Sequence, residues 1–144
     1  MSLPHSLNQA INSYETWLNE LEQKPAIQSP ENAWSAMRSV LQTLRDRMPA
    51  EEAVHLGAQL PLIARGVFFE GWKLSRDPDK MNQQEFYDRV RKRLAGTSLE
   101  NDPALMTVYA FEVINRHIDP GQINHVKATL PHDLVVLWPE QVAA

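Results

Sequence analysis

The residues best suited to chemistry in this sequence are a glutamate and a histidine three positions apart, Glu52 and His55. On a helix this spacing places both side chains on one face, and bundles that hold two metal ions combine two such pairs with two further glutamates. At the corresponding place in the second half of the chain, His125 follows Gln122, and a glutamine amide is a poor substitute for an anionic ligand. The first interpretation of Glu51 and Glu52 is that they are solvated carboxylates favoured by the positive end of a helix. The alternative is a metal or enzyme site that uses Glu52, His55 and His125, with Glu51 beside them.

Other reactive motifs are missing from the sequence. It contains no cysteine, which removes disulfides, thiolate nucleophiles and zinc-thiolate sites together. It also has no Gly-x-Ser-x-Gly elbow, no P-loop and no Gly-x-Gly-x-x-Gly motif, and its five glycines are scattered. We therefore expect no catalytic residues and no cofactor, and the sequence favours a protein that is not an enzyme without deciding the matter.

A run of basic residues, RVRKR, occupies positions 89–93 and supplies Arg89, Arg91, Lys92 and Arg93. Such a run can meet RNA, DNA or an acidic protein surface. It is also typical of a solvated helix face whose long stems cover apolar neighbours. The net charge of −4 disfavours a general nucleic-acid binder, so weak nucleic-acid binding through this run is a second alternative.

An aromatic group, Phe68, Phe69 and Trp72, follows the Leu-Pro pair at 60–61. Buried rings supply much of the stabilisation of a small core, so the first interpretation is that these side chains close the core. The other interpretation is an exposed patch that docks a partner. The sequence alone does not decide which of the three are buried.

The elements that must position these residues are helices. Apolar residues recur at spacings of three and four, with Leu7, Ile11, Tyr14 and Leu18 as the first stripe. Capping signals stand at Ser29, Asn82 with Glu85, Asp102 and Asp119, and prolines follow three of them. The predicted helices cover about residues 4–23, 30–48, 49–60, 61–70, 82–94, 103–118, 120–130 and 131–138.

The two halves of the chain share a pattern. Leu60-Pro61 and Leu130-Pro131 lie 70 residues apart. At the same offset Val40, Leu41, Leu44, Met48, Ala53, His55 and Leu56 correspond to Ala110, Phe111, Ile114, Ile118, Ile123, His125 and Val126. Amphipathic helices match partly through their period alone, but the prolines and the apolar register recur together here. We predict an all-α helical bundle of six to eight helices, built from two pseudo-repeated units of three to four helices.

This bundle is expected to form one domain over residues 1–144. The first pseudo-repeat covers about 5–72, a polar linker about 73–83, and the second pseudo-repeat about 84–138. The composition, 43% hydrophobic and 22% charged, is that of an ordinary globular protein. No apolar run approaches a membrane span and no secretion signal is recognisable, so we expect a cytoplasmic protein without a membrane partner.

The string LRDRMPAEEAVHLGAQLPLIARGVFFEGW, residues 44–72, resembles a bacterial family known as domain of unknown function 2267. LPHDLVVLW, residues 130–138, is similar to the closing segment of that family, and the resemblance extends over about residues 7–138. It implies a small all-helical bacterial domain with no established reaction, and it supplies no catalytic residues. We therefore expect a non-catalytic module that binds a protein partner or associates with itself, a homo-oligomer being one form.

Overall fold

The computed structural model describes residues 2–74 and 77–140, and the structure of this part is entirely helical. Its eight α-helices are α1 (His5–Glu22), α2 (Pro30–Arg47), α3 (Ala50–Gln59), α4 (Leu62–Phe69), α5 (Gln83–Arg93), α6 (Pro103–His117), α7 (Pro120–Ala128) and α8 (His132–Val135). The predicted all-α class is confirmed. No helix in the described ranges is both long and apolar enough to cross a membrane.

Three of the four predicted capping residues, Ser29, Asn82 and Asp119, accept a hydrogen bond from a backbone N–H at the start of their helix. The Ser29 side chain accepts a hydrogen bond from the Asn32 amide at 3.1 Å, directly before Pro30 at the first position of α2. Asn82 and Glu85 form both bonds of a capping box at the start of α5. The prediction for Asp102 was wrong in one respect: α6 begins after it, but its side chain makes no capping hydrogen bond.

The two Leu-Pro pairs end one helix and begin the next. Leu60 and Pro61 are both extended, with ψ values of 148° and 152°, because a residue before proline is driven out of the helical region and proline cannot continue the hydrogen-bond ladder. Pro131 has the same extended backbone, with ψ of 157°. The helix after it is shorter than predicted, since α8 covers only His132–Val135 and not 131–138.

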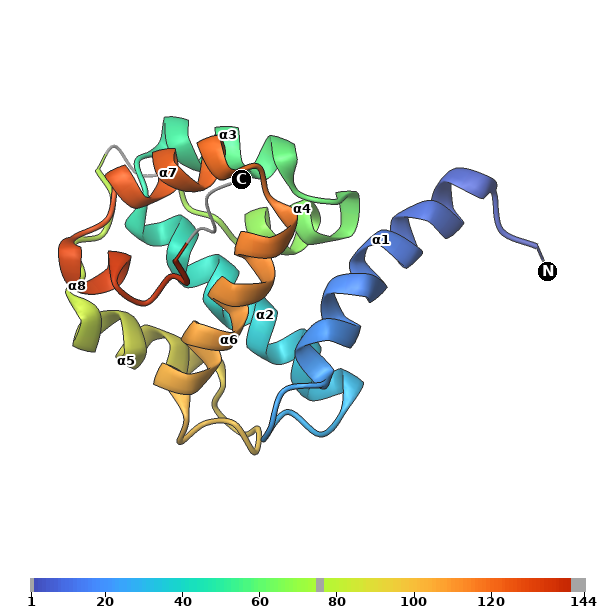
Figure 1. The fold of residues 1–144 in the computed structure, drawn as a ribbon, viewed down its shortest axis with the longest axis horizontal. Coiled ribbons are helices and arrows are strands. Elements are labelled where there is room, and N and C mark those ends of the chain that lie inside the picture. Colours follow the sequence, from blue (N-terminus) through green and yellow to red (C-terminus); the bar gives the residue numbers. More distant parts are fainter. Residues whose placement is uncertain (1, 75–76, 141–144) are drawn as a thin grey trace.

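A single cluster of buried apolar side chains draws residues from all eight helices. α2 contributes most to it and packs against α1, α4, α5 and α6, and Figure 1 shows α2 and α6 running through the middle of the molecule. Phe111 of α6 lies between Phe86 of α5, at a centroid distance of 6.0 Å, and Trp138, which stacks on it at 4.0 Å. α3 and α7 pack together on top of this core.

The first helix belongs to the core along only half of its length. Its second half is fixed to α6: Trp17 stacks on His117 at 5.2 Å, and Glu20 contacts His117 and pairs with Arg116 at 3.2 Å. The first half extends away from the body of the molecule (Figure 1), and in residues 2–13 only Ala10 is buried. We call residues 2–13 the α1 overhang.

Candidate functional site

The aromatic group after the first Leu-Pro pair closes a corner of the core. Phe68 is fully buried, and Phe69 and Trp72 are half-buried. The Phe69 ring meets Phe68 edge to face at 5.1 Å and stacks on Trp72 at 5.4 Å. It covers the backbone of Gly57 on α3, where a Cβ atom would overlap the ring. The arrangement agrees with the interpretation of these rings as core, and it leaves Phe68 unavailable to a docking partner.

The candidate metal ligands are dispersed. Glu52 accepts a hydrogen bond from the Gln122 amide nitrogen at 2.8 Å, and Gln59 donates to the Gln122 carbonyl oxygen at 3.1 Å. These bonds join α3 to α7 and occupy Glu52, while His55 and His125 are both exposed. Within residues 2–74 and 77–140, no three histidine, aspartate or glutamate side chains come together as a metal ion would require.

The basic run on α5 is largely neutralised by the chain itself. Arg89 pairs with Asp79 at 3.0 Å, and Arg91 lies 3.7 Å from Asp88. Arg93 turns inward from the helix. These pairs reduce the positive potential that a phosphate backbone would meet, so the geometry gives little support to the nucleic-acid alternative.

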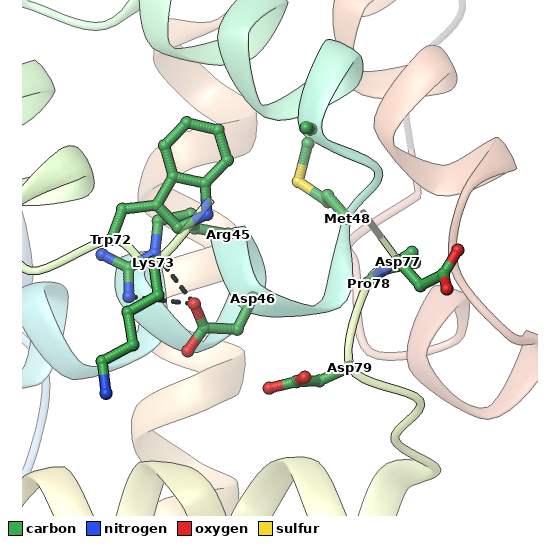
Figure 2. Close-up of a pocket in the computed structure, with 9 residues that line it drawn as sticks. Arg45, Asp46, Met48, Trp72, Lys73, Asp77, Pro78 and Asp79 are labelled. Atoms are coloured by element: carbon green, nitrogen blue, oxygen red, sulfur yellow. Dashed lines mark hydrogen bonds and ion pairs between the residues drawn. The ribbon is translucent and has the colours of Figure 1, made fainter. Parts of the chain in front are cut away.

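Arg93 belongs to a polar network around a guanidinium that the sequence did not single out. Arg45 is only 3% exposed and donates to the carbonyl oxygens of Phe68 at 3.0 Å and Glu70 at 2.9 Å. Its remaining charge is met by Asp46 at 2.9 Å, and Asp46 also accepts from Arg93 at 2.7 Å. Figure 2 shows Arg45 and Asp46 joined beneath the Trp72 ring, with Asp79 facing them.

This network is structural. Two hollows lie beside it: one of about 30 Å³, with room for about one or two water molecules, and a polar one of about 370 Å³ next to Arg93. The Arg45 donors are taken up by two carbonyls and the Asp46 carboxylate, and Arg93 is paired with Asp46, so neither guanidinium needs a bound anion. Lys73, which lines both hollows, is exposed. Arg45 supplies donors to carbonyls near the end of α4 that lack helical partners, and so fixes α4 on α2.

An apolar groove lies elsewhere, between α1, α2 and α4. This groove, here called the α1 groove, has a volume of about 290 Å³, and its apolar walls are Ile11, Tyr14, Leu18, Trp34 and Ile63. Trp34 is 40% exposed and meets Tyr14 edge to face at 5.6 Å. Glu15 and Glu22 line its edge. An indole that is held by a buried ring and still faces solvent is typical of a protein-binding surface.

An exposed apolar stripe continues from the groove along the α1 overhang. Leu3, Leu7 and Ile11 are 42%, 43% and 37% exposed; Leu7 and Ile11 lie one turn apart on one face of α1, and Leu3 precedes the helix. Leu7 and Ile11 belong to the stripe that predicted the first helix, but they contact no partner helix comparable to those that cover Tyr14 and Trp17. The stripe and the groove together form the largest uncovered apolar feature described above.

Tyr14 forms the floor of this region and is 2% exposed. Its hydroxyl group has no hydrogen-bond partner among the described residues. Burial raises the pKa of Tyr14 well above its ordinary value, because the phenolate would lose its hydration. The ring therefore acts as an apolar wall and not as an acid or base near neutral pH.

A comparison with protein-family models aligns residues 14–137 with the family described as "Uncharacterized conserved protein (DUF2267)". The chain belongs to the DUF2267 family. A comparison with curated proteins gave no match. In this DUF2267 protein the matched region begins at Tyr14, so it contains the Arg45 network and most of the α1 groove, while the α1 overhang precedes it.

Sequence reasoning did not find the groove of this DUF2267 protein. Trp34 stands beside Ala33 in a helix whose apolar face is clear, and nothing in the order of residues separates an indole at the edge of the core from one inside it. The helical period puts Arg45 off the apolar stripe of the same helix, although it is buried.

Proposed function

We propose that this DUF2267 protein is a non-catalytic protein-interaction module whose docking site is the α1 groove. The observation that carries the proposal is the partly exposed Trp34, held against buried Tyr14 at the centre of an apolar groove. Exposed apolar surface of this kind is costly in water unless a partner covers it, and indoles are over-represented among residues that dominate binding energy.

The shape of the site favours a helix as the bound element. Two wall-forming helices, α1 and α2, provide apolar side chains at successive turns, with Ile11, Tyr14 and Leu18 on one side and Trp34 on the other. An amphipathic helix places side chains three and four residues apart into such a groove. Aromatic and aliphatic anchors on the partner would bury the Trp34 indole and exclude water around it.

The duplicated architecture belongs to the same proposal. We propose that residues 5–72 and 84–138 are copies of one unit that pack around an approximate two-fold axis. Supporting this, Glu52 bonds to Gln122, the residue 70 positions later, and α3 packs on α7 as α2 packs on α6. Superposition of the two segments in an experimental structure tests the idea, and halves that do not superpose would refute it.

Capture from extracts of the native host tests the docking function. The immobilised full chain is compared with a Trp34→Ser variant and with Val136→Asp, a control at a 57% exposed valine that is distant from the groove. We expect the control to retain the captured proteins and the Trp34 variant to lose them. Equal capture by all three chains would contradict the proposal, provided that their circular dichroism spectra agree.

A further inference from the structure

We infer that the α1 groove is occupied by the α1 overhang of a second copy of this chain, giving a two-fold dimer in which each copy donates its overhang to the other. The inference rests on the proposed function and specifies the partner. It follows from three features of the described residues: an overhang without its own packing, a continuous stripe and groove, and opposite charge at their ends.

The first feature is that the helical part of the overhang has almost no tertiary packing within one chain. Residues 5–13 are helical, yet in the overhang only Ala10 is buried. Most helices in proteins are stabilised by packing of an apolar face, and within α1 only the second half has such packing. The apolar face is present as Leu3, Leu7 and Ile11, but its covering partner is missing within one chain.

The second feature is self-complementarity. Ile11 is both the last residue of the exposed stripe and the first wall residue of the groove. Two antiparallel α1 helices related by a two-fold axis near Ile11 place Leu7 of one copy at the Tyr14 level of the other, with Leu3 in the segment that precedes the helix. Along α1, Leu7 and Ile11 are four residue steps apart, about 6 Å, and Ile11 and Tyr14 are three steps apart, about 4.5 Å. A two-fold contact of this kind uses the same surface twice and closes on itself.

The third feature is charge. The first turn of α1 has no acidic residue, and residues 2–14 contain none at all. The positive end of the α1 dipole is therefore unneutralised within its own chain. Glu15 and Glu22 line the groove, and Glu31 lines the adjoining pocket. The antiparallel arrangement brings the positive end of each overhang to these carboxylates.

Sedimentation equilibrium of the purified full chain tests the inference without any other protein present. We expect twice the mass of one chain for the native sequence, and for a Val136→Asp control. Combined Leu7→Asp and Ile11→Asp substitutions put charges on exposed positions of the stripe and should weaken dimerisation at least about tenfold. A native chain that stays monomeric up to high concentration, or a double variant that dimerises like the control, would overturn the inference.

Crosslinking provides a second readout that does not depend on the aspartate variants folding. The chain has no cysteine, so Ile11→Cys introduces one thiol near the proposed axis and Val136→Cys is a matched control. Oxidation should convert Ile11→Cys rapidly to a covalent dimer and leave the control mainly monomeric. Equal rates would refute the two-fold contact.

The dimer inference and the proposed function can fail separately. If the purified chain is monomeric but Trp34→Ser still abolishes capture from host extract, the dimer inference fails while the proposed function stands. If the chain is monomeric and Trp34→Ser does not change capture, both fail.

Discussion

Replacing Arg45 by methionine tests whether the buried guanidinium fixes α4 on α2. Methionine keeps the length of the stem and removes every donor. The Phe68 and Glu70 carbonyl oxygens then lose bonds of 3.0 and 2.9 Å, while Asp46 keeps its 2.7 Å pair with Arg93. Each buried acceptor left without a donor costs about 1–3 kcal/mol, and because Asp46 keeps Arg93 no buried charge is left unpaired. We expect the free energy of unfolding to fall by about 3–4 kcal/mol.

The matched control is Arg38→Met on the same helix. Arg38 is 41% exposed and pairs with the Glu70 side chain at 3.1 Å, so its removal changes the net charge equally but breaks only a surface pair. Such pairs contribute about 0–1 kcal/mol. Urea unfolding followed by circular dichroism measures both variants, and for a chain of this length the Arg45 variant should also melt roughly 10 °C lower. Equal stabilities for the two variants would refute the structural role of Arg45.

Two further predictions concern glycine and tyrosine positions. Gly57→Ala places a methyl group against the Phe69 ring and should destabilise the fold by about 1 kcal/mol, even after the gain in helix propensity is included. Gly66 has open space around it, so Gly66→Ala should stabilise the fold by about 0.5–1 kcal/mol. Equal effects of the two substitutions on urea unfolding would contradict the packing of Phe69 on Gly57. Burial raises the pKa of Tyr14, so the folded state holds its proton while the unfolded chain releases it above pH about 10, and stability falls there with rising pH. Tyr14→Phe should therefore match the native chain near neutral pH and exceed it by about 1.4 kcal/mol for each pH unit above about 10; parallel stability curves would count against a buried hydroxyl.

The helices could be predicted because their signals are local. Ser29 before Pro30, the Asn82 and Glu85 capping box and the Leu-Pro pairs act within a few residues of the bonds they make or prevent. The same reasoning was less successful at Asp102 and after Pro131, where the surrounding packing determines whether a cap forms and where a short helix ends.

The candidate site could not be predicted in the same way, because it depends on which helices end near one another. The helical period places Leu7 and Ile11 on the same face as Tyr14, but only the lengths and positions of α2 and α4 leave the first two uncovered. For Arg45 the error runs the other way, because a charged side chain is expected to be exposed to solvent but this one is buried. Its burial is possible because two backbone carbonyls, 23 and 25 residues later in the chain, accept hydrogen bonds from its guanidinium. The sequence identified Glu52 as a candidate ligand. Its hydrogen bond with Gln122 could not be predicted, because that bond depends on the packing of α3 on α7.

Amide hydrogen exchange in the α1 overhang, measured over a range of protein concentrations, tests the central claim most directly. The amides of residues 9–13 lie within α1 but have almost no tertiary cover in one chain, so a lone overhang would open and exchange quickly. If a second copy covers them, their protection should rise with concentration and reach that of residues 17–21, while the Leu7→Asp and Ile11→Asp variant stays unprotected. Fast exchange of residues 9–13 at every concentration of the native chain would contradict the account.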